Sequence, residues 1–214
     1  VFRVLIPQTI STEGVPRPPV QSRFDELVDL KLTQLGIVPS GLCSDSDFLR
    51  RASLDIIGTL PTADEARGFL SDPSPSKRSR LVDDLLKRPE YADYWAMQWA
   101  DLLRVDREKL GAKGAYQFYA WIRQSFRENR PLDELARGLL TAEGLLSEQP
   151  AGYWYKVLAQ PNERANAAAQ VLLGVRIECA QCHHHPFDRW SQDDYFGMQA
   201  LFNQTAFKAS PRGE

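Results

Sequence analysis

Cysteine and histidine are both scarce in this chain, with three residues of each among 214. A disulfide-rich secreted scaffold would spread a larger, even number of cysteines along the chain, so this class is excluded. Two cysteines, Cys179 and Cys182, lie three positions apart, and the three histidines, 183–185, follow directly. The rare residues are therefore gathered in one cluster, which points to redox or metal chemistry.

The sequence also lacks a long apolar run and an excess of charge of one sign. Its longest nearly apolar segment, residues 167–175, is far shorter than the roughly 20 residues of a membrane-spanning helix. The 26 basic and 28 acidic side chains leave a formal charge of −2, whereas nucleic-acid-binding proteins concentrate basic charge. We therefore expect neither a membrane span nor a nucleic-acid partner.

The spacing of apolar residues is helical from about residue 22 onward, and neither sustained alternation nor an Asn-Gly or Asp-Gly turn indicates strands. The sequence predicts an all-α fold, an irregular bundle of about eight to nine helices. We expect an extended, proline-rich lead-in over residues 1–21, one helical domain over 22–205 and the start of a linker over 206–214. The lead-in carries no features of a secretory signal.

Local signals mark the ends of several helices. Ser22 is suited to cap a helix that ends at Gly36, Thr62 opens a capping box, and Ser191 caps the last helix. Residues 162–179 are alanine-rich and then apolar, which predicts a helix with the cysteine cluster at its C-terminal end. One face of the first helix is expected to hold the apolar residues Phe24, Leu27, Val28 and Leu35.

The order of residues in the cluster, Cys179-Ala-Gln-Cys182-His183, is the attachment sequence of c-type haem. On one helical turn the two thiols reach the two vinyl groups on one edge of the porphyrin, while the adjacent imidazole of His183 binds the iron as proximal ligand. Zinc is the alternative, because both thiols and one histidine supply three ligands of a tetrahedral site. A third reading is two buried cysteines without a cofactor. Zinc explains the ligand types, whereas haem also explains their order.

Other residues are weaker candidates for a role at a haem. Met198 is a candidate distal ligand, with core packing as an equally good explanation. His185 and Asp188 are candidate acid–base groups beside an open iron, with a shared turn-fixing hydrogen bond as the alternative. Arg104 is suited to bind a propionate, although a structural ion pair is favoured, and Trp190 is suited to pack against the porphyrin or in the core.

Residues 179–190 and the polar and aromatic residues that follow them resemble the planctomycete cytochrome C-like domain family, long catalogued as a domain of unknown function. Residues 48–62 and 99–104 are also similar to this family, so the resemblance covers about residues 24–202. His184 departs from the family pattern, which has an acid or its amide at this position. The resemblance implies a haem-binding domain of a large exported protein in which another domain follows, so we expect the chain to be a fragment.

Three functional hypotheses follow from the residues. The first is electron transfer by covalent haem c, with a redox protein or an adjacent domain of the same polypeptide as partner. The second is a haem enzyme with oxidative or peroxidative chemistry at an open iron, and the third is a zinc-stabilised helical interaction module. Because covalent haem attachment takes place outside the bacterial cytoplasm, the haem hypotheses predict a periplasmic or otherwise exported protein.

Overall fold

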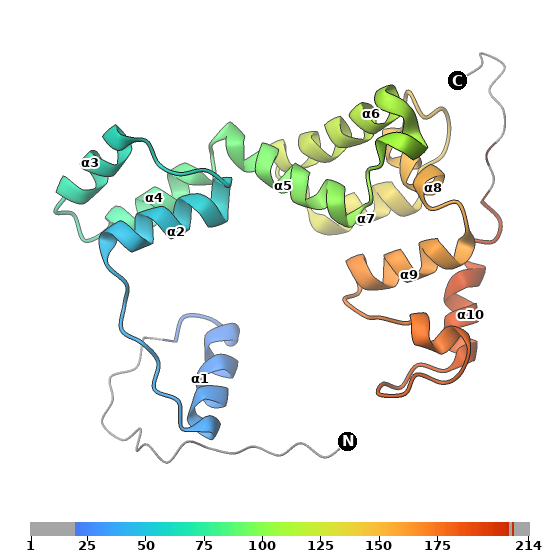
Figure 1. The fold of residues 1–214 in the computed structure, drawn as a ribbon, viewed down its shortest axis with the longest axis horizontal. Helices are drawn as coiled ribbons and strands as arrows, with labels where there is room; N and C mark the ends of the chain where they lie inside the picture. The colour runs from blue at the N-terminus through green and yellow to red at the C-terminus, as the bar shows by residue number, and fades with distance from the viewer. Residues whose placement is uncertain (1–19, 206, 208–214) are drawn as a thin grey trace. The chain divides into compact units, whose positions relative to one another are not determined.

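The computed structural model describes residues 20–205 and 207, which form an all-helical structure (Figure 1). These residues hold ten α-helices, two 3-10 helices and no strand, which confirms the predicted fold class with slightly more helices than the eight to nine expected. None of these helices is both long and apolar enough to cross a bilayer. In chain order the α-helices are α1 (Arg23–Leu35), α2 (Asp45–Ile57), α3 (Ala63–Ser71), α4 (Lys77–Leu85), α5 (Pro89–Leu102), α6 (Arg107–Arg127), α7 (Leu132–Leu140), α8 (Tyr153–Val157), α9 (Pro161–Leu172) and α10 (Gln192–Ala200), and the 3-10 helices are η1 (Pro150–Gly152) and η2 (Glu178–Gln181).

Side-chain caps begin three helices where the sequence predicts them. Ser22, Thr62 and Ser191 each accept a hydrogen bond from the backbone N–H three residues later, and the acidic side chain there bonds back to the cap. Such a capping box satisfies N–H groups that the helix itself leaves unpaired. Gly36 ends α1 with a left-handed φ of 65°. The structure thus confirms these predictions. They could be made from the sequence because a cap and its partner are close together in the chain.

The chain divides into two compact units, Val1–Phe48 and Leu49–Glu214, and α1 lies in the first. No residue of α1 is buried, and Phe24 on its predicted apolar face is 76% exposed. A helical apolar pattern shows which side is apolar and does not show what covers it.

The main core of the second unit is formed by α5, α6, α7, α8 and α9. Phe118 and Ile122 of α6 are fully buried in it, and Trp154 of α8 packs against Phe202 with ring centroids 6.1 Å apart. Helix α6 begins at Arg107 and bends at Gly111, whose φ of 73° is not helical.

A smaller core joins α9, η2 and α10, which are coloured orange to red in Figure 1. Helix α9 ends at Leu172 rather than continuing to residue 179, and Gly174 turns the chain with a left-handed φ of 67°. The apolar residues after Gly174 therefore belong to a connection, and the cysteine cluster begins on the separate helix η2. The buried members of this smaller core are Ala169, Ile177, Ala180 and Tyr195.

Candidate functional site

The two clustered cysteines are exposed on a short segment that packs against the smaller core. Cys179 lies within η2, and Cys182 follows its last residue. Both thiols are exposed and outside any disulfide, whereas Ala180 between them is fully buried in the smaller core. The amide of Gln192 at the start of α10 also donates to the Gln181 carbonyl at 3.2 Å. The segment is therefore held in place while both sulfurs stay accessible.

The three histidines after Cys182 make different hydrogen bonds. The Nδ1 atom of His183 lies 2.6 Å from the carbonyl oxygen of His184. The Nδ1 atom of His184 accepts a hydrogen bond from the backbone N–H of Gln192 at 3.4 Å, and that of His185 accepts one from the backbone N–H of Phe187 at 3.3 Å. Each ring is thus fixed through Nδ1, but only in His183 is the partner an acceptor.

These hydrogen bonds determine which imidazole nitrogen carries the proton in the neutral rings. A carbonyl oxygen only accepts, so Nδ1 of His183 carries the proton and its Nε2 atom holds a lone pair. In His184 and His185 the accepting Nδ1 atom holds the lone pair, so Nε2 carries the proton. Of the three histidines, His183 alone therefore has a lone pair on Nε2, which is able to bind a metal, and its side chain is exposed.

The rest of the loop is closed by Asp188 and Trp190. The Asp188 carboxylate accepts hydrogen bonds from the Arg189 backbone N–H at 2.7 Å and from the Trp190 indole N–H at 3.2 Å. The backbone N–H of His185 donates to the Trp190 carbonyl at 2.8 Å. His185 and Asp188 thus both fix this turn, although within the described residues no hydrogen bond joins the two side chains as the turn interpretation expected. Their proposed acid–base roles remain predictions.

The remaining candidate residues, Trp190, Met198 and Arg104, lie in different surroundings. Trp190 is partly buried against the smaller core and stacks with Arg189, whose guanidinium carbon lies 4.9 Å from the ring centroid. Met198 packs against both cores, as its alternative interpretation expected. Arg104 is exposed in the turn after α5 with a φ of 58°, and in the described part of the chain no hydrogen bond or ion pair joins it to the cluster.

The structure does not gather the cluster into a closed metal site. Among residues 20–205 and 207, no three side chains of histidine, cysteine, aspartate or glutamate come together as a metal-binding group. The thiols of Cys179 and Cys182 and the Nε2 atom of His183 are instead separate, accessible donors on one short segment.

Comparison with known protein families assigns the chain to a family. The family model of PSCyt2, described as a protein of unknown function (DUF1549), matches residues 23–207. The chain belongs to this family. The match spans the helices from α1 to α10, including the loop that carries the cysteines and histidines. The comparisons with curated proteins and with solved structures found no match.

The PSCyt2 domain also contains a buried polar feature that sequence reasoning missed. Tyr195 of α10 is fully buried, and among residues 20–205 and 207 its hydroxyl has no hydrogen-bond partner, as is also true of the Asn166 amide oxygen. Burial raises the pKa of Tyr195, and Asn166, a polar neighbour without proper hydrogen-bond geometry, offsets this only in part. No sequence signal shows whether a buried hydroxyl finds a hydrogen-bond partner.

We expect Tyr195→Phe to leave the free energy of unfolding at neutral pH within about 0.5 kcal/mol of the original, because it removes a buried hydroxyl that makes no hydrogen bond. Tyr155→Phe is the matched control: the Tyr155 hydroxyl donates to the Leu140 carbonyl at 2.7 Å, and its loss should cost about 1 kcal/mol. Urea unfolding of both variants measures this difference. A loss above about 1 kcal/mol in Tyr195→Phe would mean that its hydroxyl is satisfied.

The same variant should change the alkaline side of the stability profile. Because the pKa of Tyr195 is higher in the folded than in the unfolded chain, the folded state keeps its proton longer. Stability is then retained below the unfolded pKa of about 10 and lost as the pH rises through the folded pKa. Tyr195→Phe removes this contribution, so urea midpoints should fall less steeply above about pH 10 in the variant.

Proposed function

We propose that this PSCyt2 domain binds haem covalently through Cys179 and Cys182, with His183 as the proximal iron ligand. The observation that carries the proposal is the hydrogen bond from His183 Nδ1 to the His184 carbonyl at 2.6 Å. It leaves the Nε2 lone pair of His183 available for iron and fixes the ring, as carbonyl partners do for other metal-binding histidines. The neighbouring histidines, fixed in the opposite tautomer, are less suited to this role.

The donor set fits haem better than zinc. A structural zinc ion needs four converging ligands and a catalytic one needs three, and the described residues offer no such preformed group. A haem needs two accessible thiols on one edge and one imidazole under the iron, and the porphyrin itself supplies the four equatorial nitrogens. The exposure of both thiols in this segment supports that arrangement. Phe187, 82% exposed in the same loop, is an apolar side chain that a bound porphyrin could cover.

Electron transfer is the function that this haem would serve. Bound haem supplies a one-electron couple, and the protein residues hold it at the surface, where a second redox centre is able to approach. The partner is then a redox protein or an adjacent domain of the same polypeptide. Covalent attachment also places the protein in the periplasm or an equivalent exported compartment.

Pyridine haemochrome spectroscopy tests this proposal. The chain is exported to the periplasm of a host that expresses the haem c maturation system, purified, and denatured in alkaline pyridine. We expect an α-band at the position typical of two thioether bonds, and haem that stays on the polypeptide in a denaturing gel. A folded protein without covalent haem after this treatment contradicts the proposal, and zinc found by elemental analysis of the same sample supports the zinc module instead.

An open-site haem enzyme is the second candidate, and the position of Met198 favours it. Met198 packs against both cores, so it would have to leave this packing to bind iron. If the sixth position is open, the ferric haem is high-spin and its spectrum shifts with cyanide and with peroxide. A low-spin spectrum that responds to neither favours the electron carrier. His185 and Asp188 would then keep only their roles in the turn.

A further inference from the structure

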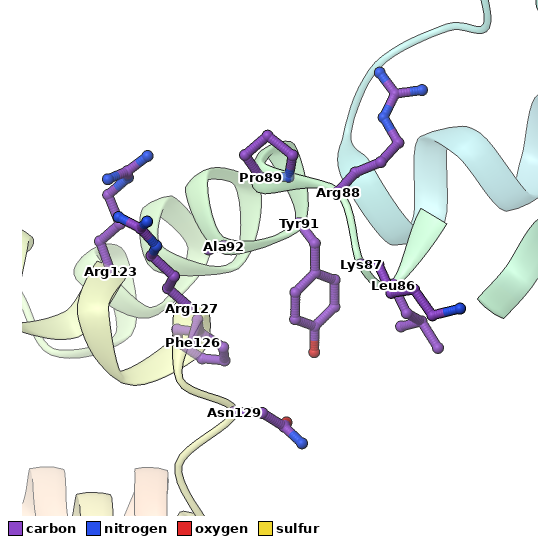
Figure 2. Close-up of a pocket in the computed structure, with 10 residues that line it drawn as sticks. All are labelled: Leu86, Lys87, Arg88, Pro89, Tyr91, Ala92, Arg123, Phe126, Arg127 and Asn129. Atoms are coloured by element: carbon purple, nitrogen blue, oxygen red, sulfur yellow. The ribbon is translucent and has the colours of Figure 1, made fainter. Parts of the chain in front are cut away.

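A cavity of about 710 Å³ lies between the first turn of α5 and the last turn of α6, far along the chain from the cysteine cluster. This volume is within the range of pockets that bind small molecules. Figure 2 shows the Tyr91 ring between Arg127 and Asn129 on one side and Leu86 and Lys87 on the other. The cavity is thus formed by two stretches of chain, residues 86–92 and 123–129, around the Tyr91 ring.

The charged residues that line this cavity are all basic. They are Lys87, Arg88, Arg123 and Arg127, and no carboxylate is among the lining residues. Arg88 is neutralised by Glu65 at 2.7 Å and Glu90 at 2.6 Å, and Figure 2 shows its side chain directed away from Tyr91. Two positive charges in the lining, on Arg88 and Arg123, are therefore already paired, the latter with Asp93.

The other two positive charges are not held in close, buried ion pairs, although Arg127 also attracts the adjacent Glu128 carboxylate, whose pKa is lowered chiefly by Gln124 and Arg130. Lys87 lies 3.9 Å from Asp84, but both side chains are about three-quarters exposed, and such a pair contributes little. Arg127 forms no ion pair in the part of the chain that the structure describes. The helix dipoles add little net field, because the positive end of α5 and the negative end of α6 meet here. The cavity thus offers about two positive charges to a ligand, and both come from side chains.

The remaining walls combine apolar surface with neutral donors. Phe126 and Ala92 give apolar surface beside the Tyr91 ring, while the Tyr91 hydroxyl and the Asn129 amide are donors at the same cavity. A ligand that satisfies all of these groups carries a compact anionic head and a flat or apolar body. A bare inorganic anion would leave the aromatic and apolar walls in contact with water.

We propose that this cavity binds a small organic phosphate monoester with an aromatic or apolar body. A phosphate monoester carries a charge of about −2 near neutral pH, which matches Arg127 and Lys87, whereas a single carboxylate would leave one of them unneutralised. The guanidinium of Arg127 forms paired hydrogen bonds with phosphate oxygens, and the Tyr91 and Phe126 rings contact the body. This site is independent of the haem proposal, since it shares no residue with the cysteine cluster.

Phenyl phosphate is the probe that tests this site, titrated into the 214-residue chain at about pH 8, where it is dianionic, and at low salt. We expect calorimetry to detect binding of phenyl phosphate that is at least tenfold tighter than that of inorganic phosphate or of phenol. Arg127→Gln should weaken it by about tenfold, the factor that corresponds to one lost charge-assisted hydrogen bond. Arg107→Gln, an exposed arginine at the other end of α6, should leave the affinity unchanged.

Several outcomes would overturn the proposal. Absence of phenyl phosphate binding, or equal affinity in Arg127→Gln with an unchanged unfolding midpoint, removes the site. If inorganic phosphate binds as tightly as phenyl phosphate, the apolar walls do not contribute to binding. If phenol binds as tightly as phenyl phosphate, the basic side chains do not contribute to binding. The titration is carried out on protein with and without haem, and the expected result is the same for both.

Discussion

Replacing both Cys179 and Cys182 by serine should abolish covalent haem attachment completely while the chain stays folded. A thioether forms only at a sulfur, so a serine oxygen at either position does not replace it. Both cysteine side chains are exposed and outside the two buried cores, so their loss should change the free energy of unfolding by no more than about 0.5 kcal/mol. Haem stain on denaturing gels and pyridine haemochrome spectra measure the loss.

The two single cysteine variants and a control variant at Cys43 make this test more specific. Cys179→Ser or Cys182→Ser alone should keep one thioether and shift the haemochrome α-band, because one vinyl group is left unreacted. Cys43→Ser is the control, since Cys43 lies in the first unit, and it should keep the full covalent haem content. Covalent haem on the double variant, or its loss from Cys43→Ser, would contradict the assignment of the two thiols.

The two adjacent histidines test the axial ligand in the same preparation. His184→Ala should keep the ferric spectrum, because Nε2 of His184 carries the proton in the hydrogen-bonded ring. His183→Ala should lose the proximal ligand, with a changed spectrum or failed maturation. The reverse pattern would transfer the ligand role from His183 to His184.

The parts of the fold that could be predicted from sequence are those with a local chemical cause. Ser22, Thr62 and Ser191 begin their helices as expected because a cap and its partner are separated by only three residues. The end of α9 could not be predicted in this way. Residues 171–177 continue the apolar pattern of the helix, and Gly174 is one glycine among the 13 of the chain, without a local signal that it takes the left-handed conformation.

At the candidate site the sequence predicted which residues are present and not how they are arranged. The order of Cys179, Cys182 and His183 predicts these residues as haem-binding groups, because it matches the sequence pattern of covalent haem attachment. The structure adds the hydrogen bonds that distinguish His183 from its two neighbours, and these depend on Gln192 and Phe187, whose positions follow from the packing of the loop. The basic cavity was missed because Arg123 and Arg127 belong to α6, whereas Lys87 and Arg88 directly precede α5.

Arg164 was also missed, and it is expected to be the most important single side chain for stability. It lies in the alanine-rich helix α9 and is only 3% exposed. Its guanidinium donates to five oxygens and lies with its central carbon 5.1 Å from the Tyr155 ring centroid. Burial lowers the pKa of Arg164, and none of its hydrogen-bond acceptors is a carboxylate that would offset this. The acceptors are the carbonyls of Tyr155, Leu158, Ala159 and Phe202 and the hydroxyl of Thr205.

Arg164→Met should lower the free energy of unfolding by about 3–5 kcal/mol, because it leaves several buried carbonyls without a donor. This is a large share of the roughly 5–15 kcal/mol that stabilises a domain. Arg164→Lys should recover only part of it, since an ammonium group has three donors and no planar fork. Urea midpoints give the values, and Gln170→Met on the exposed side of the same helix should stay within about 0.5 kcal/mol. A loss below about 1 kcal/mol in Arg164→Met would mean that water replaces the guanidinium.

The position of Arg164 links this stability to the candidate site. Its hydrogen bonds to Phe202 and Thr205 tie α9 to the segment directly after α10, and the cysteine and histidine loop lies between these two helices. Arg164→Met should therefore loosen both ends of the loop and lower the yield of haem-loaded protein, although the variant keeps every proposed ligand. The fraction of molecules that do carry haem should show an unchanged haemochrome spectrum. A shifted α-band would instead mean that Arg164 affects the thioether bonds themselves.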